Sequence, residues 1–199
     1  MRPNCASCLR PEITCICHLV STVYTDVEVL ILQHPMEVLE TKGIARLLHL
    51  CLPNSRLIMG EVFEDTILKN SLSTKDSILL YPTTTEDYSL GIAPSPELNA
   101  AVLYNLNNIR LIIIDGTWRK SRKLLIKNPY LQTLSRLVLQ DLPAGQYTIR
   151  KVRKPHQLST LEATCTALAQ LEMNAQKFEP ITQAFYEFNL FIVKQMKFV

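Results

Sequence analysis

The chain has 199 residues, of which 47% are hydrophobic and 20% are charged, and its formal net charge is +3. A chain of this length can bury a full hydrophobic core, so we expect one α/β domain with a small N-terminal appendage. The sequence contains no apolar stretch near the roughly 18 residues of a membrane span, and its start lacks the apolar segment of a secretory signal. We therefore expect a cytoplasmic protein that makes no membrane contact and has no evident obligate protein partner.

The N-terminal appendage is predicted from the spacing of cysteines. Four of the six cysteines fall within thirteen positions: Cys5, Cys8, Cys15 and Cys17. Tetrahedral Zn²⁺ takes four thiolates at about 2.3 Å, and each close pair can present its two sulfurs from one turn. Two disulfides or unrelated buried thiols are the alternatives, but disulfides do not persist in a reducing compartment. We predict a structural zinc site in residues 1–22 and a main domain over residues 23–199.

The main domain alternates predicted strands with predicted helices. Apolar runs predict strands at residues 27–32, 56–62, 77–81, 111–114 and 136–139. Helical periodicity and capping signals predict helices at residues 41–52, after Asp115 through Lys127, from the capping box Ser159-x2-Glu162 to about residue 173, and after Pro180. Cys51 and Cys165 lie in helical patterns and are expected to be core thiols. This alternation predicts a mostly parallel sheet with helices on both faces.

The strand at residues 111–114 is followed at once by Asp115-Gly116-Thr117-Trp118. Ligands bind at the carboxyl ends of strands in open α/β sheets, so Asp115 and Trp118 are candidate site residues. Each also has a structural interpretation, because Asp115 could cap a turn or a helix and the single tryptophan could be core. At the end of the first strand, His34 either contacts a bound ligand or closes a turn, and we favour the turn.

Charge is distributed unevenly along the chain. Residues 1–100 contain 7 Lys and Arg against 12 Asp and Glu, whereas residues 101–199 contain 14 against 6. Two basic clusters follow the candidate site: Arg119, Lys120, Arg122 and Lys123, and then Arg150, Lys151, Arg153 and Lys154. A solvated surface is the usual explanation for such runs. Beside a candidate site, however, concentrated cations favour nucleic acid, because binding to phosphates releases counterions.

Four sequence blocks together resemble the DTW-domain family. These blocks are the cysteine cluster; His34-Pro35-x-Glu37 with Thr41-Lys42-Gly43-Ile44-Ala45-Arg46-Leu47-Leu48; Asp115-Gly116-Thr117-Trp118; and Tyr147-x2-Arg150-Lys151 with Leu158-Ser159-Thr160-Leu161-Glu162-Ala163. The resemblance covers nearly the whole chain and looks closest to the bacterial tRNA-uridine aminocarboxypropyltransferase branch. It implies a SPOUT-like fold with a knotted C-terminal half. It also implies transfer of the 3-amino-3-carboxypropyl group of S-adenosylmethionine to N3 of a uridine in tRNA.

This chemistry assigns roles to particular residues. Uridine N3 is mostly protonated at neutral pH, so a base must take its proton, and Asp115 is the only carboxylate between Glu97 and Asp141. We assign Asp115 as base or orienting acceptor, with Thr117 beside it and with Trp118 stacked on a base or placed near the sulfonium. Candidates for binding S-adenosylmethionine are Thr41 for its methionine end, at a helix N-terminus, and Leu137, Leu139, Leu142, Leu158, Ser159 and Thr160 for its adenine and ribose.

Structural roles remain alternatives for these cofactor candidates: Thr41 and Ser159 as helix caps, and Leu139 and Leu158 as core. Two other functions also stay open on the sequence. One is a SPOUT-type RNA methyltransferase, and the other is a non-catalytic zinc-ribbon RNA-binding protein.

Overall fold

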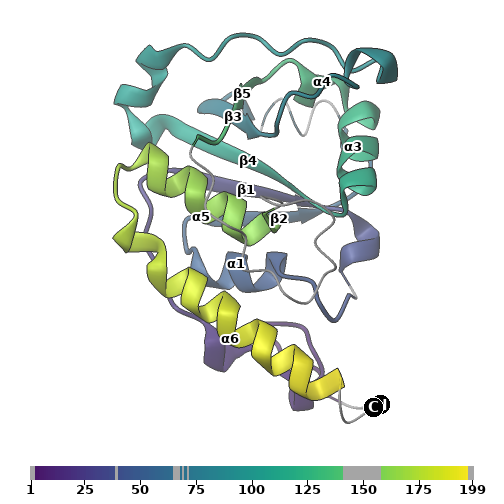
Figure 1. Cartoon of the computed structure of the whole chain (residues 1–199), viewed down its shortest axis with the longest axis vertical. Coiled ribbons are helices and arrows are strands. Elements are labelled where there is room, and N and C mark those ends of the chain that lie inside the picture. Colours follow the sequence, from purple (N-terminus) through teal and green to yellow (C-terminus); the bar gives the residue numbers. More distant parts are fainter. Residues whose placement is uncertain are drawn as a thin grey trace.

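A five-stranded parallel sheet forms the centre of the molecule in this computed structural model, which describes residues 3–38, 40–64, 68, 70, 72–140 and 158–196 (Figure 1). The strands lie in the order β2-β1-β4-β3-β5. Their bounds are β1 (Glu28–Gln33), β2 (Ser55–Met59), β3 (Asp76–Leu80), β4 (Ile109–Asp115) and β5 (Ser135–Leu137). Each pairing between neighbouring described strands is parallel, so their carboxyl ends lie at one edge. The predicted parallel sheet is confirmed.

The helices divide between the two faces of this sheet, as Figure 1 shows. Their bounds are α1 (Ala45–Cys51), α3 (Trp118–Lys127), α4 (Pro129–Gln132), α5 (Thr160–Leu171) and α6 (Glu179–Met196). On the central strand β4, Leu111 and Ile113 pack in one core cluster with α1, α5 and α6, whereas Ile112 and Ile114 pack in a second cluster with α3 and α4. Because successive strand side chains point to opposite faces, this alternation gives the side of the sheet on which each β4 residue lies.

Capping side chains explain where two of these helices begin. Thr117 Oγ1 accepts a hydrogen bond from Lys120 N at 3.4 Å at the start of α3. Ser159 Oγ accepts one from Glu162 N at 3.2 Å, and Glu162 Oε2 accepts one from Ser159 N at 2.8 Å. The predicted capping box at the start of α5 is therefore confirmed.

The helix predicted from residue 41 begins instead at Ala45. Residues 40–43 turn tightly, because Gly43 N donates to Glu40 O at 2.8 Å. A Cβ atom at Gly43 would lie 3.0 Å from Glu40 O, which favours glycine at this position. Thr41 therefore lies in a loop ahead of α1, and the expected helix terminus at Thr41 is wrong.

The cysteine-containing segment packs directly on α6. Ile16 and Leu19 belong to the same core cluster as Phe188 and Ile192 of this helix. The His18 ring also lies 5.5 Å from that of Phe191, measured between centroids. The N-terminal segment and the main domain therefore share one hydrophobic core.

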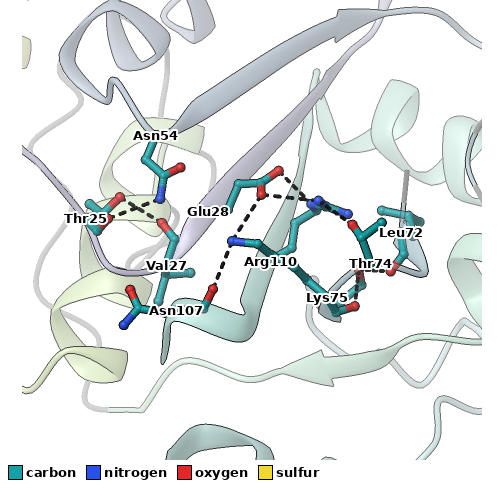
Figure 2. Close-up of polar contacts among 10 residues, drawn as sticks. Thr25, Val27, Glu28, Asn54, Leu72, Thr74, Lys75, Asn107 and Arg110 are labelled. Atoms are coloured by element: carbon teal, nitrogen blue, oxygen red, sulfur yellow. Dashed lines mark hydrogen bonds and ion pairs between the residues drawn. The ribbon is translucent and has the colours of Figure 1, made fainter. Parts of the chain in front are cut away.

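The amino edge of the sheet is held by an ion-pair network (Figure 2). Arg110 at the start of β4 donates through Nε to Glu28 Oε1 on β1 at 2.8 Å, and through Nη2 to Thr74 Oγ1 at 3.2 Å. Lys75 Nζ lies 3.3 Å from Glu28 Oε2 and donates to Asn107 O at 2.9 Å. Arg110, although basic and close in sequence to the candidate site, thus lies at the opposite edge of the sheet and balances a carboxylate.

No helix in the described part of the chain is long and apolar enough to cross a membrane.

Candidate active site at the carboxyl edge of the sheet

The sheet order makes the boundary between β1 and β4 a topological switch point at the carboxyl edge. From β1 the chain continues to β2 on one side, and from β4 it continues to β5 on the other. Ligands bind at such a switch point in open α/β sheets, because the connecting segments diverge there. Gln33, the last residue of β1, lies at this point with His34 after it, opposite Asp115, the last residue of β4.

Asp115 is buried at this switch point, with 5% of its surface exposed. Its Oδ2 accepts a hydrogen bond from Gln33 Nε2 at 3.1 Å, and its carbonyl accepts one from His34 N at 3.0 Å. Strand alternation places both Gln33 and Asp115 on the face covered by α1 and α5. Thr117, and not Asp115, caps α3, so the helix-cap interpretation of Asp115 is wrong.

Sequence analysis missed Gln33. The signal in the sequence is a polar residue that ends an apolar strand, whereas its register with Asp115 is set only by the fold. His34 forms the turn that we favoured, since its Nδ1 accepts a hydrogen bond from Met36 N at 3.2 Å at the start of the short helix Pro35–Glu37.

Several predicted cofactor residues lie on the same face of the sheet as Asp115. Leu137 and Leu139 pack against the core cluster that contains α5. The chain beyond β5 is tied to α5, because Gln170 Nε2 donates to Gln140 O at 2.6 Å. Leu158, Ser159 and Thr160 are half-buried at the start of α5, and Ser159 also serves as its cap. Leu142 lies outside the described residues.

The Trp118 side chain lies on the other face of the sheet, with α3. It is 42% exposed, so the interpretation of Trp118 as ordinary core is wrong. Its ring stacks on Tyr81, with 5.3 Å between centroids and 7° between planes. Tyr81 is buried in the cluster of α3 and α4. Asp115 and Trp118, neighbours in one motif, therefore present their side chains to different sides of the same sheet edge.

Buried groups hold Tyr81 in place. The Arg136 guanidinium carbon lies 5.5 Å from the centroid of the Tyr81 ring, and Arg136 Nη1 pairs with Asp87 Oδ2 at 2.7 Å. Burial raises the pKa of Tyr81, which keeps its hydroxyl protonated. On the other partner of the stack, the Arg122 guanidinium carbon lies 5.6 Å from the Trp118 ring centroid. A fixed cation therefore already occupies a place beside this indole, which favours a neutral base over a sulfonium as its further partner.

Most of the predicted RNA-binding cations on α3 are engaged with carboxylates. Lys120 pairs with Glu37 at 2.7 Å and Arg122 with Glu86 at 2.9 Å. Lys123 and Lys127 both pair with Glu61, at 2.6 and 3.0 Å. Hydrogen bonds from these two lysines lower the pKa of Glu61 to about 2.

The remaining members of the predicted basic surface differ in position. Arg119 is exposed and forms no ion pair with any residue that the structure describes. The second predicted cluster, Arg150, Lys151, Arg153 and Lys154, lies outside the described residues.

The four N-terminal cysteines converge as predicted. Their sulfurs all lie within 4.8 Å of one another, with 3.5 Å between Cys5 and Cys17 and 3.8 Å between Cys8 and Cys15. Tetrahedral Zn²⁺ with bonds of about 2.3 Å places its sulfurs roughly 3.8 Å apart. Backbone hydrogen bonds from Cys8 and Ser7 lower the pKa of Cys5 to about 6, whereas burial raises the pKa of Cys17 to about 12, so the fit to a metal rests on the sulfur geometry. The cluster therefore fits a zinc ion.

Comparison with known proteins gives a match to one family over nearly the whole chain. The DTW domain matches residues 2–193. A mouse protein named tRNA-uridine aminocarboxypropyltransferase 2 is 29% identical over 184 residues, which cover 87% of this chain and 58% of the mouse protein. The Drosophila melanogaster protein of the same name is 29% identical over 181 residues, covering 86% of this chain and 67% of its own length.

A more distant plant relative, tRNA-uridine aminocarboxypropyltransferase A of Arabidopsis thaliana, is 26% identical over 137 residues, covering 62% of this chain and 50% of its own length. The chain thus spans between half and two thirds of the length of these relatives. No solved structure matches the chain.

Proposed function

Because this chain belongs to the DTW domain family, we propose that it transfers the 3-amino-3-carboxypropyl group of S-adenosylmethionine to N3 of a uridine in tRNA. The observation that carries this proposal is the buried pair of Asp115 and Gln33 at the switch point between β4 and β1. A carboxylate held in this way at a switch point, where ligands bind in open α/β sheets, suits a reaction that must remove a proton from the acceptor. The names of the mouse, fly and plant relatives supply the reaction class.

In the proposed reaction, Asp115 takes the proton from uridine N3. The N3 electron pair attacks the γ carbon of the aminocarboxypropyl group, the bond between this carbon and sulfur breaks, and its electron pair stays on sulfur. The products are 3-(3-amino-3-carboxypropyl)uridine and neutral methylthioadenosine, and the proton on Asp115 then passes to solvent. Gln33 orients the carboxylate by donating to Oδ2. Thr117 shapes the turn after Asp115 by capping α3.

The two faces of the sheet edge divide the two substrates in this proposal. S-adenosylmethionine binds on the Asp115 face, against Leu137, Leu139 and Leu142 after β5 and against Leu158, Ser159 and Thr160 at the start of α5. Thr41 in the loop before α1 holds its methionine end. The choice of γ carbon over methyl then depends on which carbon this bent donor presents to N3.

The RNA binds at α3 in this proposal. Trp118 stacks on a base, and Arg119, Lys120, Arg122 and Lys123 contact phosphates together with Arg150, Lys151, Arg153 and Lys154. Since carboxylates already pair with Lys120, Arg122 and Lys123, RNA phosphates must replace these carboxylates for the whole group to bind.

We further propose that the fold is SPOUT-like with a knotted C-terminal half and that the protein works in the cytoplasm. Residues 1–22 would bind one structural Zn²⁺ through Cys5, Cys8, Cys15 and Cys17, and residues 23–199 would form the catalytic domain.

Mass spectrometry of nucleosides tests this function. tRNA incubated with the protein and S-adenosylmethionine should yield a uridine that is heavier by one aminocarboxypropyl group, together with methylthioadenosine. A uridine heavier by one methyl group would identify a methyltransferase instead. Binding of tRNA without any modified nucleoside, and without binding of S-adenosylmethionine in calorimetry, would identify a non-catalytic RNA-binding protein.

A further inference from the structure

The Arg10 side chain connects the cysteine segment to the loop ahead of α1. Its Nη2 donates to Thr41 O at 2.8 Å and to Gly43 O at 3.1 Å. Its own backbone is fixed within the segment, because Cys5 N donates to Arg10 O at 2.8 Å. The guanidinium carbon also lies 5.1 Å from the ring centroid of Phe188 on α6. Two carbonyls in the loop of residues 40–43 thus accept hydrogen bonds from Arg10, which lies between Cys8 and Cys15 in the sequence.

The same loop contacts the segment that leads to the candidate active site. A Cβ atom at Gly43 would lie 3.1 Å from Glu37 O, so the loop packs against the backbone of Glu37. The Glu37 carboxylate is 3% exposed and accepts a hydrogen bond from Lys120 Nζ at 2.7 Å. Lys120 lies in the first turn of α3, directly after the Asp115 motif. A continuous set of contacts therefore runs from the cysteine segment through Arg10, the loop and Glu37 to the start of α3.

We propose that Arg10 is a positioning residue that holds residues 40–43 for binding of S-adenosylmethionine and transmits the order of the cysteine segment to this loop. The identity of the ligand rests on the proposed function. Arginine suits this role, because its planar guanidinium keeps several N–H donors in a rigid arrangement that can serve two carbonyls at once. Lysine keeps the charge but presents a single flexible ammonium, so it should replace arginine only in part.

Amide hydrogen exchange of residues 40–47 in the zinc-loaded protein tests the positioning without any assay of activity. Arg10→Met keeps an unbranched side chain over Phe188 and removes both donors, so these amides should exchange about tenfold faster or more. Arg10→Lys should give an intermediate rate. The matched control is Arg56→Met, because Arg56 is exposed on β2 and has no ion pair or side-chain hydrogen bond among the described residues. Its exchange rates should equal those of the wild type.

Steady-state kinetics test the consequence for the ligand. Arg10→Met should raise KM for S-adenosylmethionine roughly tenfold, with kcat and KM for tRNA nearly unchanged, and Arg10→Lys should recover part of this loss. The zinc content of Arg10→Met should stay at one ion per chain, because the four cysteines are intact. A purely structural loss of folded enzyme would lower the apparent kcat and leave KM unchanged.

Removal of zinc by a chelator tests the coupling. Chelation should speed exchange at residues 40–47 in the wild type and add little in Arg10→Met, because the connection is already broken. Equal and additive effects in both proteins would overturn the coupling, and wild-type exchange rates in Arg10→Met would overturn the positioning role. Loss of zinc from Arg10→Met would also overturn the proposal, since Arg10 would then support the metal segment itself.

The outcomes for the inference and for the function are distinguishable. Faster exchange with an unchanged KM for S-adenosylmethionine would overturn the role of Arg10 in ligand binding. If wild-type protein forms no modified nucleoside, the proposed function fails, while the exchange and chelation results still decide whether Arg10 couples the cysteine segment to the loop.

Discussion

The Asp115 carboxylate is buried at the end of β4 and hydrogen-bonded to Gln33, and Thr117 caps the following helix. Because Asp115 and Thr117 have separate roles, each can be changed without removing the other's hydrogen bond. A substitution at Asp115 changes the proposed proton-accepting group and leaves the α3 cap in place. Loss of the cap, by contrast, typically costs about 1 kcal/mol of folding free energy.

Asp115→Asn should lower kcat by roughly 100-fold or more, with binding of tRNA and S-adenosylmethionine little changed. The amide keeps the size of the side chain and can still accept a hydrogen bond from Gln33, but it cannot take the proton from uridine N3. The measurement is kcat at saturating substrates, with both dissociation constants and the thermal midpoint as controls. A stable variant that binds both substrates and turns over near the wild-type rate would remove Asp115 as the base.

At the scale of single elements, carboxylates from other segments pair with most of the cations of α3. Glu61 binds both Lys123 and Lys127, and Glu86 binds Arg122 beside the Trp118 ring. These carboxylates come from the segments after β2 and β3 and lower the positive charge that α3 offers to a polyanion. If α3 binds RNA as proposed, its affinity should therefore depend on acidic residues outside the helix.

Glu61→Gln should strengthen tRNA binding severalfold at low salt and make the salt dependence of binding steeper, because Lys123 and Lys127 become available to phosphates. The matched control is Glu187→Gln, which removes the same charge from an exposed position on α6. The measurement is the dissociation constant for tRNA across a salt series. An equal gain in both variants would mean that only net charge matters and that α3 is not the binding surface.

The Glu28 ion pairs at the amino edge of the sheet should make the stability of the protein depend on pH in the acid range. Burial alone would raise the pKa of Glu28, but hydrogen bonds and charges from Arg110 and Lys75 outweigh burial and lower it below its ordinary value of 4.5. Because the carboxyl group is more acidic in the folded protein, its contribution to stability is present above this ordinary value. It is lost as the pH falls through the lowered pKa of the folded state.

Glu28→Gln should therefore be less stable than the wild type near neutral pH and should lose less further stability as the medium is acidified from about pH 5 to about pH 3. Thermal midpoints measured across this interval test the prediction, with Glu187→Gln as the surface control. Parallel pH profiles for the wild type and Glu28→Gln would show that the Glu28–Arg110 contact does not stabilise the sheet.

At the scale of the whole molecule, the cysteine segment is part of the main core. Cys8 is 2% exposed and packs in the same cluster as Ile16, Leu19 and residues of α6. The sequence analysis treated residues 1–22 as a separate appendage. With this packing, loss of the metal should affect the stability of the whole chain as well as the order of the segment.

Cys8→Ser should reduce bound zinc well below one ion per chain and lower the thermal midpoint of the whole protein. The matched control is Cys165→Ser, which alters a buried thiol of α5 outside the four-cysteine group and should lower the midpoint without loss of zinc. Elemental analysis and thermal unfolding measure the two effects. A zinc content below one ion per chain in the wild type, with Cys8→Ser unchanged, would refute the zinc site.

Local patterns in the sequence correctly indicated much of this molecule. Apolar runs predicted the five strands, the Ser159-x2-Glu162 pattern predicted the start of α5, and cysteine spacing predicted that four sulfurs converge. The position of Asp115 at the end of a buried strand was also predictable. Each of these features depends on residues within a few positions of one another, where periodicity, capping and spacing act directly.

The tertiary structure alone decided which distant residues meet. Gln33 reaches Asp115 because β1 lies next to β4 in parallel register, and Trp118 stacks on Tyr81 because β3 lies on the other side of β4. Sheet order likewise brings Glu37 to Lys120 on α3 and sets Arg110 at the far edge. No local pattern encodes these contacts, because strand order and register depend on how all the helices and strands bury their apolar faces together.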